Sequence, residues 1–368
     1  MKRFEALDSW RGIAACLVAF HHLGLAVNSH LNGFALVPNS YLFVDFFFVL
    51  SGFVIAANYE KRLAEGYGVW RFALLRFGRL YPLHLAVLVA LIALRLAHSA
   101  SGLGEASAFA APRWSADTIV ANLLLVQSLH LYDFTPWNGP SWSISTEFYT
   151  YLLFAAAVTL YRRSIVLLLL PVVLASAAAL WFLAGGIGTT YDWGLVRCIC
   201  SFAAGAMIWH AHRARSLRAG TALELMSILL IVVFVCNAGK GALSLAAPAV
   251  FGLAVLVFAE EAGAVSRWLR KPPLLWLGGR SYSIYMVHFL VAWLLADCLK
   301  VLRRAGLDLI AGVETARWQN DVVTLVYIVL VLAVAAFTYR AIEVPARAWF
   351  RRLATIELQS TPRPAVID

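Results

Sequence analysis

The fold is decided near the amino terminus, where residues 7–22 read LDSWRGIAACLVAFHH. In an α-helix, eleven steps of about 100° return to nearly the same azimuth, so Arg11 and His22 share one helix face. They lie about 16 Å apart along the axis, and Asp8 is one turn from Arg11, which predicts an ion pair. Ionisable groups are costly inside a bilayer, so Arg11 and His22 are candidates for function.

The chain as a whole is also strongly apolar in composition. Of 368 residues, 62% are hydrophobic and 14% are charged, and the mean hydropathy is +0.77. These values exclude a soluble globular protein and indicate a polytopic membrane protein. The net charge of +10 comes from basic residues between apolar runs, which is typical of contact with anionic lipids. No basic stripe with interleaved aromatic residues occurs, so we expect no nucleic-acid partner.

Ten apolar segments are long enough to cross a bilayer, which takes roughly 17–25 residues. We expect an all-α polytopic membrane helix bundle with spans at about 10–28, 41–58, 80–98, 142–160, 164–184, 194–212, 221–238, 243–259, 280–298 and 321–342. The stretch Ile119–Leu131 is too short to span and is expected to be an interfacial or re-entrant helix.

Ten crossings put both termini on one side of the membrane. Most of the 30 lysine and arginine residues lie on that side, so the positive-inside rule predicts cytoplasmic termini. We expect one membrane domain over residues 1–352 and a short disordered cytoplasmic tail over residues 353–368, which contains Pro362 and Pro364. The five cysteines show no zinc or redox spacing, and we expect no metal site.

The second span contains the run FVDFFFVLSGF, residues 43–53. Its Asp45 lies near the predicted outer end, where it is expected to orient or charge-stabilise His22; a role in packing alone is the alternative. Ser51 and Gly52 lie near the middle and allow close approach of a neighbouring helix or a ligand.

The loop before the third span is rich in arginine. Arg76 and Arg79 are one turn apart at the cytoplasmic interface, a geometry that suits bidentate contacts to phosphate. The plainer interpretation is that these residues, with Arg71, only retain the loop on the cytoplasmic side.

Two further polar clusters lie at span ends. In the run WNGPSWSISTEFY, residues 137–149, Trp142 and Ser143 suit sugar stacking and hydrogen bonding, and Glu147 is expected to order the acceptor or His22; a favourable helix-dipole contact is the alternative for Glu147. In the run SYSIYMVH, residues 281–288, one polar face carries Ser281, Tyr285 and His288. That face suits either a substrate or an interhelical hydrogen-bond seam.

In their order along the chain, these motifs resemble acyltransferase family 3, the integral-membrane O-acyltransferases that modify bacterial surface glycans and some small glycosides. The resemblance covers nearly the whole chain. It is carried by Leu7-Asp8-x-x-Arg11-Gly12 with His22, Phe43-Val44-Asp45 through Ser51-Gly52-Phe53, Arg76-x-x-Arg79-x-x-Pro82, Trp142-Ser143-x-Ser145-x-Glu147-x-x-x-Tyr151, Ser281-Tyr282-x-Ile284-Tyr285-x-x-His288 and Glu343-x-Pro345.

The resemblance implies transfer of an acyl group, acetyl by default, from cytoplasmic acyl-CoA to a hydroxyl of a glycan, glycolipid or other carbohydrate-containing acceptor. It implies a multi-pass protein of the bacterial inner membrane that uses acyl-CoA as co-substrate and has no bound cofactor. It makes His22 the catalytic candidate and links Arg11 to acyl-CoA, and its Arg-x-x-Arg pair maps to Arg76 and Arg79. We expect Arg76 and Arg79 to hold the phosphates of acyl-CoA with Ser51 beside it, and His22 to act as general base. The doubled histidine departs from the family pattern; spacing and helix azimuth favour His22 over His21.

Two other functions compete with an acyltransferase. A transporter or flippase for a lipid-linked sugar would use the same polar residues without chemistry, but no internal repeat is visible and the arginine pair disfavours it. A non-catalytic membrane scaffold predicts that substitutions of Arg11 and His22 are silent. The sequence leaves open the acceptor, the acyl chain length, the oligomeric state and whether an acyl-histidine intermediate forms.

Overall fold

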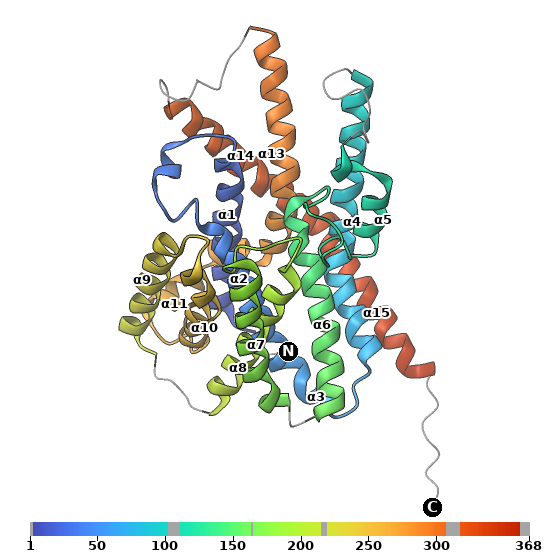
Figure 1. Ribbon diagram of the computed structural model, residues 1–368, viewed down its shortest axis with the longest axis vertical. Helices are drawn as coiled ribbons and strands as arrows, with labels where there is room; N and C mark the ends of the chain where they lie inside the picture. The colour runs from blue at the N-terminus through green and yellow to red at the C-terminus, as the bar shows by residue number, and fades with distance from the viewer. Residues whose placement is uncertain (1–2, 102–110, 163–164, 215–218, 307–316, 361–368) are drawn as a thin grey trace, which may run out of the picture.

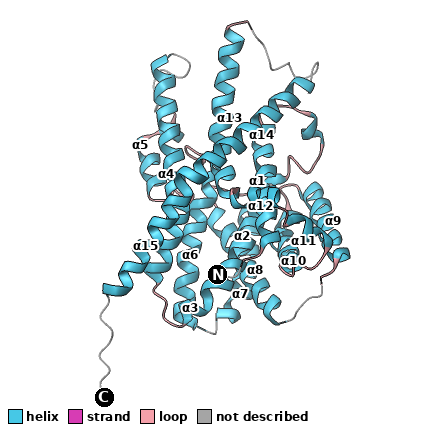
Figure 2. Cartoon of the chain, turned by 180° about the vertical axis from the view of Figure 1, so that it is seen from behind, coloured by secondary structure: helices cyan, strands magenta, loops and turns pink. Residues whose placement is uncertain are grey.

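The computed structural model describes residues 3–101, 111–162, 165–214, 219–306 and 317–360. Within these ranges the chain is helical and contains no strand, as Figures 1 and 2 show from opposite sides. The longer helices are α1 (Glu5–Gly24), α2 (Phe43–Ile55), α4 (Val69–Ser101), α6 (Trp142–Tyr161), α7 (Ile165–Ala184), α8 (Gly194–Ala214), α9 (Thr221–Ala238), α10 (Ala247–Phe258), α13 (Ser281–Arg304), α14 (Arg317–Thr338) and α15 (Val344–Ser360).

Short helical elements connect the long ones. They are η1 (His30–Gly33), η2 (Ser40–Leu42), the π-helical η3 (Ala56–Glu60), α3 (Lys61–Ala64), η4 (Pro112–Trp114), α5 (Ala116–Leu123), η5 (Gly139–Ser141), η7 (Ala242–Ala246), α11 (Ala264–Leu269), α12 (Pro272–Gly279) and the π-helical η8 (Tyr339–Glu343). The eight-residue α5 is too short to cross a membrane, as expected for the stretch Ile119–Leu131.

Each of the ten predicted spans falls on a helix, although residue 164 lies outside the described residues. Seven helical stretches are long and apolar enough to cross a membrane, and they support an integral membrane protein: Ser40–Ala64, Val69–Ser101, Ile165–Ala184, Gly194–Ala214, Thr221–Ala238, Ser281–Arg304 and Arg317–Thr355. The other three predicted spans correspond to α1 and α6, which contain many polar residues, and to the short α10.

The centre of the bundle is the contact between α2 and α8. A Cβ atom on Gly52 would lie 1.9 Å from the carbonyl oxygen of Phe202, and one on Gly205 would lie 1.8 Å from that of Val49. The two backbones therefore touch, which only glycine permits. Most of α2 is buried, and this contact fixes the helix that carries Asp45 and Ser51.

The carboxyl-terminal helix runs further than the sequence indicated. The predicted disordered tail, residues 353–368, is wrong for its first part, because α15 continues to Ser360. Leucine, alanine, isoleucine, glutamate and glutamine dominate residues 353–359, and these are mostly good helix formers. Earlier in α15, Phe350 packs over Gly78 of α4. Residues 361–368 lie outside the described residues.

Candidate functional site: an arginine-lined cavity and a histidine pair

A cavity of about 860 Å³ opens among α1, α2, α4, α6, α13 and α15. Segments from both ends of the chain thus supply its walls. Its charged lining is dominated by arginine, with Arg3, Arg11, Arg62, Arg71, Arg76, Arg79, Arg347 and Arg351. Of the predicted site residues, it brings together Arg11, Arg76, Arg79, Ser51, Glu147, Ser143 and Tyr285.

Several of these guanidinium groups are only partly satisfied. Arg76 donates to the hydroxyl of Tyr59 at 3.1 Å, yet the Nε atoms of Arg71, Arg76 and Arg347 are buried and have no acceptor among the described residues. Buried donors normally have partners. Unpaired guanidinium groups around one cavity are what an anionic ligand such as a phosphate would satisfy.

Carboxylates at the edge of the cavity pair with three of the arginines. Arg3 donates to Asp8 at 2.8 Å, and Arg11 lies 3.7 Å from the same carboxylate, which confirms the predicted Asp8–Arg11 ion pair. The hydrogen bond to Asp8 raises the pKa of Arg3, against the smaller effect of burial. Arg347 pairs with Glu343 one helical turn away, and Glu343 also accepts from Ser283.

Ser51, Glu147 and Tyr151 form a compact polar cluster in the cavity wall. Glu147 Oε1 accepts from Ser51 Oγ at 2.6 Å and from Tyr151 OH at 2.5 Å, and the two hydroxyls lie 2.5 Å apart. Two hydrogen bonds to one carboxylate oxygen fix its orientation. Glu147 therefore faces Ser51 of α2, and its polar partners are hydroxyls, not the His22 imidazole that the sequence suggested.

Further along the bundle, Ser143 and Tyr285 join α6 to α13. Their hydroxyls are 2.8 Å apart, and Tyr285 also donates to the carbonyl of Pro140 in η5 at 2.9 Å. The neighbouring Trp142, predicted to stack on an acceptor sugar, is instead buried between helices. Its ring packs against Phe48 and lies 5.1 Å from the guanidinium of Arg197.

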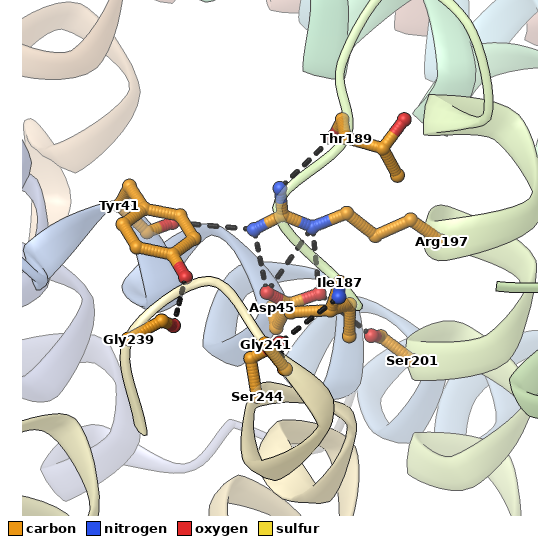
Figure 3. A network of polar contacts seen from close by, with 9 residues as sticks. All are labelled: Tyr41, Asp45, Ile187, Thr189, Arg197, Ser201, Gly239, Gly241 and Ser244. Atoms are coloured by element: carbon orange, nitrogen blue, oxygen red, sulfur yellow. Dashed lines mark hydrogen bonds and ion pairs between the residues drawn. The ribbon is translucent and has the colours of Figure 1, made fainter. Parts of the chain in front are cut away.

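Asp45 belongs to a separate buried network (Figure 3). Its carboxylate accepts from Arg197 Nη2 at 2.6 Å, from Arg197 Nε at 3.1 Å and from Ser201 Oγ at 2.9 Å. Arg197 also donates to the carbonyls of Thr189 at 3.0 Å and Tyr41 at 3.3 Å. Both charged groups are almost fully buried, with 0% of Asp45 and 1% of Arg197 exposed.

This network corrects the expectation that Asp45 orients His22. A buried carboxylate takes the strongest available cation, and α8 presents Arg197 directly to it. The sequence contained the relevant clue, because Arg197 is a charged residue within an apolar span and such residues tend to pair with one another.

His22 lies on α1 with another imidazole as its neighbour. Its Nδ1 is 2.9 Å from the carbonyl oxygen of Val18, and its ring centroid is 4.9 Å from that of His288 and 5.1 Å from that of His21. Neither His22 nor His288 is among the described residues that line the cavity. Tyr285 connects the two regions, because it lines the cavity and its ring is 5.8 Å from His288.

The sequence missed several groups that line the cavity. Tyr59, Tyr67 and Arg351 come from segments without a recognised motif, and only the folded chain brings Tyr59 to Arg76 and Tyr67 to Arg71. Over the residues described, no group of three or more histidine, cysteine, aspartate or glutamate side chains is arranged to hold a metal ion.

Comparison with known proteins gives the family. The family described as "Acyltransferase domain" matches residues 4–340. A relative named "Protein 2 in picA locus", from Rhizobium radiobacter, is 34% identical over 190 residues, which cover 48% of this chain and 96% of that protein. "Acyltransferase MdmB" from Streptomyces mycarofaciens is 36% identical over 146 residues.

That second match covers 39% of this chain and only 32% of the length of the Streptomyces protein. No solved structure matches. The family match nonetheless extends over nearly all of the chain, and it agrees with the order of motifs from Arg11 to His288 and with the bundle of apolar helices. The chain therefore belongs to acyltransferase family 3 and is a membrane acyltransferase.

Proposed function

We propose that this protein transfers an acyl group, acetyl by default, from cytoplasmic acyl-CoA to a hydroxyl of a carbohydrate-containing acceptor such as a glycan or glycolipid. The observation that carries the proposal is the arginine-lined cavity, with buried Nε donors that have no acceptor among the described residues. Acyl-CoA carries several phosphate groups at one end and its thioester at the other. Such a donor suits a cavity that is cationic along one wall and leads towards a base.

The position of each group supports a path for the donor. Arg76 and Arg79, with Arg11, would hold the phosphates by charge-assisted hydrogen bonds. The pantetheine arm carries amide N–H groups and a hydroxyl, and Glu147 with Ser51 offers them acceptors further into the cavity. The thioester would then approach Tyr285 and Ser143, beside the pair of histidines.

In the proposed reaction, His22 acts as general base through Nε2. Its Nδ1 faces a backbone carbonyl, so Nδ1 carries the proton in the neutral ring and Nε2 is free to accept another. The acceptor hydroxyl gives up its proton to Nε2 as its oxygen attacks the thioester carbon. The C–S bond then breaks, and the proton passes to the departing thiolate of CoA.

The test is acyl transfer from radiolabelled acetyl-CoA in membranes of source cells in which the gene is deleted and complemented. A general base contributes about 10²–10⁴-fold to the rate, so His22→Ala should lower the rate of label incorporation at least about a hundredfold. The matched control is His21→Ala, which removes the adjacent imidazole and should keep most of the activity. A fully active His22→Ala variant would refute the assignment of the base.

The arginines give a second arm of the same experiment. Each charge-assisted hydrogen bond contributes about 1.5–3 kcal/mol, so Arg76→Gln or Arg79→Gln should raise the KM for acetyl-CoA about tenfold or more. A transporter or flippase of lipid-linked sugar would incorporate no label from acetyl-CoA in the wild type, and that result would overturn the proposed function itself.

A further inference from the structure

Two imidazole rings meet between α1 and α13. The centroids of His22 and His288 are 4.9 Å apart, and the ring planes are inclined by 54°. His288 is 0% exposed, and His22 is half-buried. The more accessible ring therefore lies directly against a fully buried one.

Backbone carbonyls determine which nitrogen of each ring carries the proton. Nδ1 of His22 lies 2.9 Å from the oxygen of Val18, and Nδ1 of His288 lies 2.6 Å from the oxygen of Tyr285. A carbonyl oxygen only accepts, so each Nδ1 donates. In both neutral rings, Nε2 is consequently left with its lone pair.

The Nε2 atom of His288 is a buried acceptor without a donor. Among the residues that the structure describes, none forms a hydrogen bond with it; the ring of His22, with its centroid 4.9 Å away, is a neighbouring group that a small rotation would bring into reach. Unpaired buried acceptors are rare and call for a functional explanation. A donor that is present only during the reaction supplies one, and a protonated His22 is such a donor beside this ring.

The surrounding helices hold the two rings together. The hydroxyl of Tyr327 on α14 donates to the carbonyl of His288 at 3.2 Å and to that of Ala19 at 3.3 Å. These bonds tie α13 to α1 one turn away from His22. Asn138 donates to the carbonyl of Met286 at 3.2 Å and fixes α13 from the side of η5.

We propose that His288 is a positioning residue: its Nε2 accepts a hydrogen bond from the protonated His22 and thereby stabilises the imidazolium form during acyl transfer. The proposal rests on the function proposed above, in which His22 is the base. The hydroxyl proton moves to Nε2 of His22 as the acceptor oxygen bonds to the thioester carbon. The new N–H donates to His288 until the C–S bond breaks and the thiolate takes the proton. The products are the ester and free CoA thiol, and both rings end neutral.

Other titratable groups surround the pair. On α1, the ring of His21 lies beside that of His22 and contacts the ring of Tyr41 in η2. The positive charge of Lys240, between α9 and η7, also acts on His21. Tyr285 is on α13 itself, and Tyr327 approaches from α14. None of these groups is a carboxylate, so the neighbouring imidazole is the acceptor placed to stabilise a cation on His22.

The test compares His288→Leu with His288→Gln by their pH–rate profiles. The probe is radiolabelled acetyl-CoA with unsealed membrane fragments from source cells that carry the full chain, from about pH 5 to 8, where histidine titrates. His288→Leu should lower the plateau rate about tenfold to a hundredfold, the effect of losing a hydrogen bond to a charged group. Its acid limb should also move to lower pH, because the imidazolium has lost its acceptor. His288→Gln, which keeps an acceptor oxygen, should recover much of both effects.

A purely structural role predicts something different. It would lower the rate of His288→Leu without moving the acid limb, and His288→Gln would perform no better; either result overturns the proposal. The KM for acetyl-CoA and the thermal melting point of each variant report whether the fold is retained. Should His288→Leu fail to accumulate in the membrane, His288→Phe takes its place, because it keeps a buried ring but has no acceptor; an unmoved acid limb in that variant contradicts the proposal.

The His22→Ala variant keeps the two hypotheses apart. If His22→Ala is active, the function proposed for His22 fails. If His22→Ala is inactive while His288→Leu has the rate and pH profile of the wild type, only the role of His288 fails.

Discussion

Asp45 and Arg197 show how one residue pair organises the interior of this protein. The arginine binds the carboxylate through Nε and Nη2, and Ser201, Thr189 and Tyr41 satisfy the remaining groups. The pair joins α2 to α8 and to the connection before α8 (Figure 3). A complete set of hydrogen bonds is the condition under which buried ions are tolerated.

Removing one member of this pair should be more harmful than removing both. Asp45→Asn or Arg197→Gln alone leaves a buried charge without its partner, which costs about 3–5 kcal/mol. The double variant leaves two neutral side chains, so we expect it to melt at a higher temperature than either single variant. Thermal unfolding of the protein purified in detergent measures the difference.

The control for that measurement is the exposed pair Lys61–Glu65, with nitrogen and oxygen 3.7 Å apart. Its removal should leave the melting temperature nearly unchanged, because surface ion pairs contribute little. Strictly additive single effects at Asp45 and Arg197 would show that the pair is not coupled.

The sequence identified charged residues in apolar helices but not their partners. Asp45 was expected beside His22, whereas it binds Arg197, 152 positions further along the chain. The pairing depends on which faces of α2 and α8 meet, and hydrophobic periodicity alone does not specify the rotation of one helix against another. The Asp8–Arg11 ion pair was predictable because both residues lie on one helix.

Among the elements, α2 and α8 make the tightest contact, and a single methyl group should disrupt it. A Cβ on Gly52 would lie 1.9 Å from a backbone oxygen of α8, so Gly52→Ala forces the helices apart. Overpacking of this kind costs about 1–3 kcal/mol. We expect a lower melting temperature and reduced acyl transfer, because Ser51 is displaced with the helix.

Gly33→Ala is the matched control, since nothing lies within 4 Å of the position of its Cβ. This variant should behave like the wild type in both the melt and the transfer assay. A Gly52→Ala variant that is equally unaffected would contradict the close contact between the helices.

Helix positions were largely predictable, and their ends were not. Apolar runs located the bundle, and all ten predicted spans coincide with helices. The last part of the carboxyl-terminal helix α15 was not predicted, because its sequence is polar and because the nearby Pro362 and Pro364 are typical of a disordered tail. Its length depends on packing against α4, where Phe350 covers Gly78, and a tertiary contact of this kind leaves no periodic pattern in the sequence.

For the whole molecule, we predict ten crossings with both termini in the cytoplasm. A fusion truncated after Gly33 should place its reporter outside the cytoplasm, where alkaline phosphatase is active. A fusion truncated after Gly66 should place its reporter in the cytoplasm, where green fluorescent protein is fluorescent. A reporter at the carboxyl terminus should be fluorescent. If the reporter after Gly33 is outside and the carboxyl terminus is also outside, the number of crossings is odd, and the arginine-rich cavity does not face cytoplasmic acyl-CoA from the predicted side.

The cavity joins the two ends of the chain. Arg11 lies on α1 and Arg3 just before it, whereas Arg347 and Arg351 lie on α15, the last helix; Figure 1 shows these two helices. During synthesis the amino-terminal wall enters the membrane long before the carboxyl-terminal wall leaves the ribosome. A nascent chain therefore has no complete arginine-lined cavity until its final helix has docked. A frameshift or premature stop near residue 340 would leave an inserted protein that lacks Arg347 and Arg351, and we expect such a protein to lose the proposed binding of acyl-CoA.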